Sequence, residues 1–387
     1  MSGPRNPVLL GLTVAAAVAI AATGFVGEAP NRLVSGRPIA LWDAVDGPTL
    51  ACIAALGLAL AAAAFLRQSR RLLGMTIVGA AGLLLLLLYG AGEAATSLAV
   101  GASPAARTSL GPAFWIASLC AALAIIDALQ RLDARPLLRL MVALAAIGLI
   151  GVMAAHGLFD SLSIMREYAI RRASFAAEFG RHCALVFGAL VPAVAIGVPL
   201  GLLAARRPRR RAGIFSALNL LQTIPSVAMF GLLIAPLSAL AVSVPALGAI
   251  GVRGIGAAPA VVALVLYSLL PVVRNTETGI AAVDPAVIET AIGMGMTPRQ
   301  IFWRIELPLG LPVFLAGLRI VMVQAIGLAV VAALVGAGGL GSFVFQGLGQ
   351  YAIDLILLGA LPTIFLALAA DFAMRLLITL AARRRSP

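Results

Sequence analysis

Long apolar runs constrain this chain more than any other feature. A helix needs about 20 apolar residues to cross the roughly 30 Å hydrocarbon core of a bilayer, and the sequence contains ten runs of suitable length. The predicted spans are residues 8–26, 50–66, 74–90, 112–129, 137–155, 183–204, 214–240, 257–273, 309–335 and 353–380. The sequence therefore predicts an all-α, polytopic membrane protein with about ten transmembrane helices.

Composition excludes a soluble domain. The chain is 62% hydrophobic and 11% charged, whereas soluble domains are about 45–50% apolar and about 25% charged. The first run resembles a signal peptide, but no convincing small-residue cleavage site leads into a soluble chain, so we interpret it as a retained span.

The distribution of positive charge predicts the orientation. The net charge is +13 and every basic residue is arginine. The arginines lie in the short segments between apolar runs, which favours membrane topology over nucleic-acid binding. Counting alternate segments places 18 arginines on one side and 8 on the other. The richer side is predicted to be cytoplasmic in a bacterial inner membrane, with both termini on that side.

The sequence changes character near residue 160. We predict an amino-terminal transmembrane region over 1–157, an external amphipathic linker helix over 158–180 and a five-span core over 181–387. The linker could also be a partner surface, or simply a solvated connection. Its helical spacing is carried by Ile164, Tyr168, Arg171, Arg172 and Phe175.

The segment 274–308 carries two helix starts. Asp284 precedes Pro285 and Thr297 precedes Pro298, and each pair combines an N-cap acceptor with proline at the first helical position. Glycines at 293 and 295 can end the first helix, because glycine tolerates the left-handed backbone. The pattern predicts a helical hairpin on the cytoplasmic side, suited to docking on another protein.

The same segment resembles the EAA-type coupling loop of ABC importer permeases, with only Thr290 replacing alanine. The matching positions are Glu289, Thr290, Ala291, Gly295, Ile305, Leu307 and Pro308. The resemblance implies that the loop seats on a cytoplasmic ATPase, with Ala291 and Gly295 allowing close approach and Glu289 holding the loop by hydrogen bonding. An ordinary capped loop would explain the helix starts but not this spacing.

Flanking segments resemble the permeases of osmoprotectant importers, which carry glycine betaine, choline, carnitine and related quaternary ammonium solutes. The likeness covers roughly residues 178–345 and leaves out the first five spans. It rests on segments 199–211, 219–230, 266–280 and 335–348. It implies an ATPase subunit, an external solute-binding protein and a second permease, which is a copy or a homologue. The alternatives are a permease of the same superfamily for an amino acid or another small solute, and a secondary transporter.

A polar stripe marks a candidate translocation pathway. Asn219, Gln222 and Thr223 interrupt an apolar span, and Pro225 frees backbone carbonyls beside them. Polar groups at membrane depth face either a cavity or a neighbouring helix, and the sequence leaves both interpretations open. Further candidates are Tyr267, Phe230 and Gln324.

Other motifs exclude enzymatic roles. The chain has no lysine and hence no Walker A motif, so ATP and Mg²⁺ are expected on a partner chain, with no cofactor bound here. GAGGLG at 336–341 follows a membrane span and not a strand, which argues against a dinucleotide site. The scattered cysteines and histidines predict no metal site, and we find no catalytic set. Gly197 and Gly201 form a GxxxG pattern compatible with close helix packing.

Overall fold

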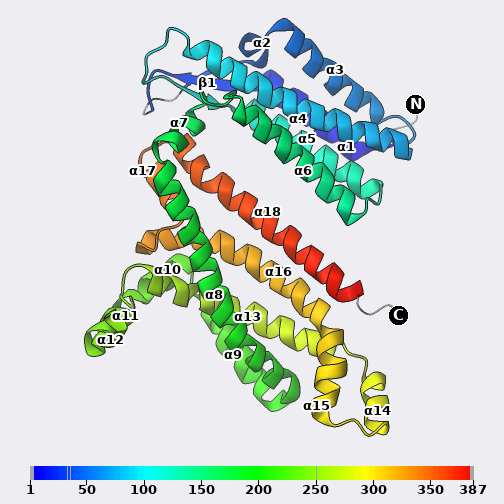
Figure 1. Ribbon diagram of the computed structural model, residues 1–387, viewed down its shortest axis with the longest axis vertical. Helices are drawn as coiled ribbons and strands as arrows, with labels where there is room; N and C mark the ends of the chain where they lie inside the picture. The colour runs from blue at the N-terminus through cyan, green and yellow to red at the C-terminus, as the bar shows by residue number, and fades with distance from the viewer. Residues whose placement is uncertain (1–3, 33, 35, 250, 384–387) are drawn as a thin grey trace. The chain divides into compact units, whose positions relative to one another are not determined.

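The computed structural model describes residues 4–32, 34, 36–249 and 251–383. The chain forms two compact units, Met1–Ile170 and Arg171–Pro387 (Figure 1). In the described part, eight helices are long and apolar enough to cross a membrane, and two shorter apolar helices, Pro7–Ala22 and Gly47–Ala63, accompany them. The predicted all-α, polytopic fold is confirmed.

Unit 1 contains the first five predicted spans. Its long helices are α1 (Pro7–Ala22), α3 (Gly47–Ala63), α4 (Arg70–Ala99), α5 (Pro112–Arg131) and α6 (Pro136–Ala155). The side chains of Asn6, Asp46 and Ser69 accept hydrogen bonds from the first turns of α1, α3 and α4. Buried alanine, leucine and phenylalanine side chains join these helices into one core, to which α6 contributes no buried residue.

A small sheet in unit 1 was not predicted. Strands β1 (Val26–Ala29), β2 (Arg37–Ile39) and β3 (Arg107–Leu110) pair antiparallel in the order β2-β1-β3. The strands have only three or four residues each; β1 and β2 lie between α1 and α2, and β3 lies between α4 and α5. Such short segments give no usable alternating pattern, so the sequence does not reveal their pairing. The short helices α2 (Leu41–Ala44) and α7 (Ser163–Ile170) complete the unit.

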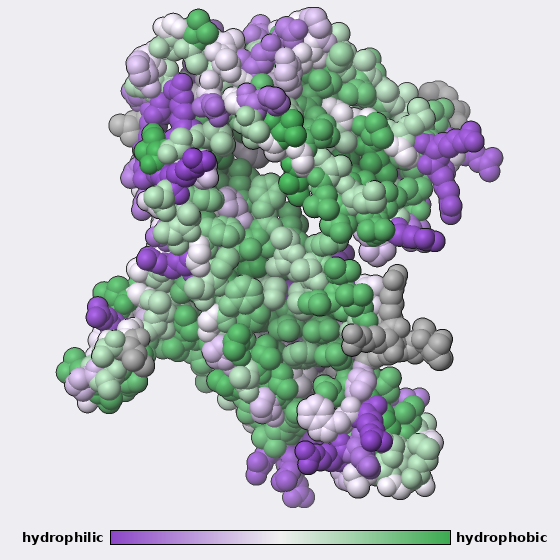
Figure 2. Space-filling view, in the orientation of Figure 1, coloured by the Kyte–Doolittle hydropathy of each residue, from purple (hydrophilic) through white to green (hydrophobic). Residues whose placement is uncertain are grey.

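Unit 2 contains the other five predicted spans. Its elements are α8 (Arg172–Arg206), α9 (Pro208–Thr223), α10 (Ser226–Leu232), α11 (Ile234–Ser243), α12 (Pro245–Ala249), α13 (Ala257–Ala281), α14 (Pro285–Gly293), α15 (Pro298–Ile301), η1 (Phe302–Glu306), α16 (Leu307–Val331), η2 (Ala332–Val335), α17 (Gly341–Gly349) and α18 (Ile353–Arg383). Apolar residues cover most of the surface along α8, α13 and α16, and hydrophilic residues gather around α9, α14 and α15 (Figure 2).

Glycines set the close packing of α8 against α13. A Cβ atom on Gly197 would lie 2.7 Å from Cγ1 of Val272, and one on Gly201 would lie 2.7 Å from the carbonyl oxygen of Val273. Both distances are too short for a side chain, so the GxxxG pattern serves helix packing here.

Two predicted segments differ in the structure. The span 214–240 is not one helix, because α9 ends at Thr223 and α10 begins at Ser226. Ile224 has an extended ψ of 125°, the conformation that a following proline favours. The linker predicted over 158–180 is also divided: α7 ends at Ile170, and residues 172–180 form the first turns of α8.

Candidate functional site

The segment 274–308 contains a tightly capped hairpin at one end of unit 2 (Figure 1). Oδ1 of Asp284 accepts a hydrogen bond from the backbone N–H of Ala286 at 2.9 Å. Thr297 and Gln300 form a reciprocal capping box, in which the N–H of Thr297 donates to Oε1 of Gln300 at 2.8 Å. Both predicted helix starts are therefore present, and each is satisfied by its own side chain.

Gly295 closes the turn between the two hairpin helices. Its φ is +79°, a left-handed conformation that favours glycine. The N–H of Gly295 donates to the carbonyl of Ile292 at 2.9 Å, and that of Met296 donates to the carbonyl of Ala291 at 3.1 Å. This pair of bonds is a Schellman motif, which ends α14 and turns the chain toward α15.

The hairpin exposes apolar side chains. Ile292, Met294 and Trp303 are 60%, 69% and 58% exposed, and Val287 is 41% exposed. Large apolar side chains clustered on one exposed segment are typical of a protein interaction site. The hairpin therefore offers a surface that a partner protein can cover.

The motif residues divide between exposed and buried positions. Ala291 is 1% exposed, so it packs inside this chain and does not lie at a partner surface, contrary to what the resemblance implied. Glu289 is exposed, and within the described part of the chain its side chain makes no hydrogen bond or ion pair, so the implied holding bond is absent here. Oγ1 of Thr290 donates to the carbonyl of Ala286 at 2.7 Å. Ile305, Leu307 and Pro308 are half-buried at the base of the hairpin.

The second hairpin helix continues into the membrane span. Helix α15, the π-helical segment η1 and α16 follow one another without a break, so the span predicted over 309–335 begins earlier, at Pro298. The N–H of Leu307 bonds to the carbonyl of Phe302 across the π turn. Pro308 has no N–H to donate, and its ring excludes a regular α turn beside it.

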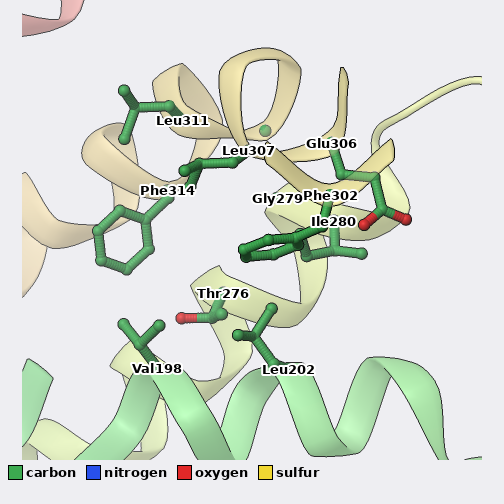
Figure 3. Close-up of a pocket in the computed structure, with 11 residues that line it drawn as sticks. Val198, Leu202, Thr276, Gly279, Ile280, Phe302, Glu306, Leu307, Leu311 and Phe314 are labelled. Carbon is green, nitrogen blue, oxygen red and sulfur yellow. The ribbon is translucent and has the colours of Figure 1, made fainter. Parts of the chain in front are cut away.

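Glu306 is a functional candidate that the sequence did not reveal. It occupies the unspecified position of the motif, is 1% exposed, and forms an ion pair with Arg206 at the end of α8. A cavity of about 110 Å³ adjoins it, lined from α8, α13, η1 and the base of α16 by residues that include Leu202, Thr276 and Phe302 (Figure 3). An acidic residue at the start of an apolar run was the available signal. The pair ties the base of the hairpin to α8.

Two of the candidate pathway residues meet. Nε2 of Gln222 donates to the carbonyl of Tyr267 at 2.8 Å, and the hydroxyl of Tyr267 donates to the carbonyl of Ile224. Tyr267 is 8% exposed. These bonds join α13 to the non-helical residues between α9 and α10, next to Pro225. Such bonding between neighbouring helices was one of the two interpretations that the sequence left open.

The other candidates are separate from this pair. Asn219 lines an open cleft of about 590 Å³, shared with Phe215, Arg274 and Glu277. Thr223 is exposed and donates to the carbonyl of Leu220 at 2.7 Å. Gln324 is exposed on α16, and its side chain has no hydrogen-bond partner among the described residues. Phe230 is buried in the same apolar core as Tyr267. The structure thus does not gather the seven candidate pathway residues into one site.

The part of the chain that the structure describes holds no group of three or more histidine, cysteine or acidic residues placed to bind a metal.

Comparison with known proteins identifies relatives of unit 2. Residues 197–386 match the family model described as the binding-protein-dependent transport system inner membrane component. The carnitine transport permease OpuCB of Listeria monocytogenes is 39% identical over 194 residues, which cover 50% of this chain and 82% of that one. This chain belongs to the ABC importer permeases. The osmoprotectant import permease OsmW of Salmonella typhimurium is 41% identical to this chain, and the match covers 50% of this chain and 85% of OsmW.

The amino-terminal region of the permease has its own match. Residues 4–165 match the family model described as the N-terminal domain of the ABC transporter permease YehY. The first five spans, for which the sequence offered no family resemblance, therefore resemble a domain found in another permease of this class.

Proposed function

We propose that this permease forms the pathway for an osmoprotectant, namely glycine betaine or a related quaternary ammonium solute. One observation carries the proposal: relatives about 40% identical over more than four fifths of their own length are named as carnitine, choline and osmoprotectant permeases. The alternatives are a permease for an amino acid or another small solute and, with a different energy source, a secondary transporter.

We infer that the hairpin at 285–301 is the coupling element. A separate ATPase chain would bind ATP and Mg²⁺ and dock on the exposed Ile292 and Met294. The ion pair between Arg206 and Glu306, together with the unbroken helix from Pro298, supports a rigid transmission path. An external binding protein would deliver solute, and a second permease, identical or homologous, would complete the pathway. The arginine distribution supports an inner-membrane location with both termini on the cytoplasmic side.

The test is transport by the reconstituted complex. The permease would be purified with its associated subunits, placed in proteoliposomes, and assayed for uptake of labelled glycine betaine with and without ATP. ATP-dependent uptake that choline or carnitine reduces is the expected result. ATP-dependent uptake of amino acids alone would replace the solute assignment, and uptake without ATP would replace the transporter class.

A further inference from the structure

A polar cavity of about 200 Å³ lies beside the small sheet of unit 1. Its polar lining comes from Glu28 of β1, Ser103, Thr108 of β3, Ser161 just before α7 and Arg166 within α7. The rest of the lining comes from the segment 98–106 that connects α4 to β3. The cavity is built wholly from unit 1, so nothing in the transport core is needed to form it.

Two opposite charges line this cavity without meeting. The side chain of Glu28 is half-buried and makes no hydrogen bond or ion pair to any described residue, including Arg37 directly across the strand pair. Nη1 of Arg166 donates to the carbonyl of Ala106 at 3.0 Å, and the guanidinium has no carboxylate partner in the described part of the chain. The neighbouring acid, Glu167, pairs instead with Arg32 at 3.5 Å.

Partly buried charges are costly when they are unpaired. Arg166 keeps several unused N–H donors, since a guanidinium carries five in a planar fork that matches a carboxylate. Glu28 is an acceptor that an ammonium group can satisfy. A ligand with both groups would satisfy both side chains at once, whereas a single ion would leave one of them unpaired.

We propose that this cavity binds a small zwitterion of the amino-acid type, with its ammonium group at Glu28 and its carboxylate at Arg166. None of the described residues that line it carries an aromatic ring, and a quaternary ammonium group is recognised chiefly by aromatic faces. The ligand therefore carries a protonated amine. This makes the cavity a ligand-binding site that is chemically distinct from the proposed solute pathway, and it does not depend on which solute is transported.

The test is calorimetric titration of the full-length complex in nanodiscs. The probes are glycine and γ-aminobutyrate as zwitterions, methylammonium and acetate as the two half-ligands, and glycine betaine as the quaternary analogue. We expect saturable binding of at least one zwitterion, at least tenfold weaker binding of betaine, and no saturable binding of either half-ligand. Equal binding of betaine and glycine, or no binding of any zwitterion, would overturn the proposal.

Substitution locates the binding. Glu28→Gln keeps the side-chain shape and removes the charge, so it should weaken zwitterion binding at least tenfold. Arg166→Gln should also weaken zwitterion binding at least tenfold. The midpoint of thermal unfolding of this variant checks that unit 1 stays folded without the bond to Ala106. Asp43→Asn removes an exposed carboxylate of unit 1 that lies outside the cavity lining, and it should leave binding unchanged. Binding that survives Glu28→Gln would place the site elsewhere and contradict the proposal. Betaine uptake is measured separately, so either result leaves the transport assignment independently testable.

Discussion

The hairpin at 285–301 and the polar stripe at 219–225 use polar and apolar residues in opposite ways. The hairpin lies among hydrophilic residues, yet it exposes Ile292 and Met294. The stripe interrupts an apolar span, yet its Gln222 is bonded within the chain, to the carbonyl of Tyr267. In the hairpin, the apolar side chains that contrast with their polar surroundings are exposed and available to a partner protein. In the stripe, Gln222 is already bonded within the chain.

This difference separates function from stability. An exposed apolar side chain on a polar segment contributes little to the stability of the fold. Its burial under a partner protein contributes favourably to the free energy of binding. A hydrogen-bonded side chain between helices stabilises the fold and contributes little to recognition. Substitutions in the hairpin should thus affect coupling, and substitution of Gln222 should affect unfolding.

The largest effect is expected from charging the exposed face of the hairpin. Ile292→Asp combined with Met294→Asp should lower ATP-dependent uptake at least tenfold and release the ATPase during purification, because carboxylates would be buried at the docking surface. Thr290→Ala is the matched control, since it restores the family motif and should leave uptake unchanged. Normal uptake by the double variant would remove the hairpin from the coupling path.

A smaller effect is expected at the base of the hairpin. Arg206→Gln leaves Glu306 buried without its cation and should destabilise the protein by about 2 kcal/mol. This is less than for a fully buried ion pair, because Arg206 is half exposed and solvent screens its charge. Thermal unfolding in detergent would measure this. Adding Glu306→Gln should recover most of the loss, and a double variant no better than the single one would show that the pair is not the cause.

The smallest effects are expected from substituting two glutamines, Gln222 and Gln324, which should respond differently. Gln222→Leu removes the bond to Tyr267 and should cost about 1 kcal/mol of stability with an unchanged KM for uptake. Gln324→Leu changes an exposed amide of α16 that has no partner among the described residues, and should raise the KM with little change in stability. The opposite assignment of effects would return Gln222 to the pathway.

Local signals made the hairpin predictable from sequence. Asp284, Thr297 and Gly295 each act on neighbouring backbone groups, so their spacing alone indicates the caps and the turn. The long apolar runs likewise predict the spans, because their length is set by the bilayer. The break at 224–225 could also have been placed from Pro225, whose effect on the preceding residue is local.

Features that depend on distant residues were not predictable in this way. The pairing of Glu306 with Arg206 spans 100 positions, and the sheet joins strands from two connections, α1–α2 and α4–α5. The burial of Ala291 and the bond from Gln222 to Tyr267 depend on how helices pack. No pattern within a single segment records such contacts.

The most direct test compares a glycine ahead of α13 with the glycine in the turn between α14 and α15. Gly295 and Gly251 both have positive φ, +79° and +92°, and a Cβ atom on either would meet open space. Aspartate tolerates this conformation better than most residues, so Gly295→Asp and Gly251→Asp should both insert and fold. Co-purification with the ATPase, followed by ATP-dependent uptake in proteoliposomes, would compare them. We predict that Gly251→Asp retains the ATPase and that Gly295→Asp loses it or uncouples hydrolysis from uptake. Coupled, wild-type uptake by Gly295→Asp would contradict the assignment of the hairpin as the coupling element.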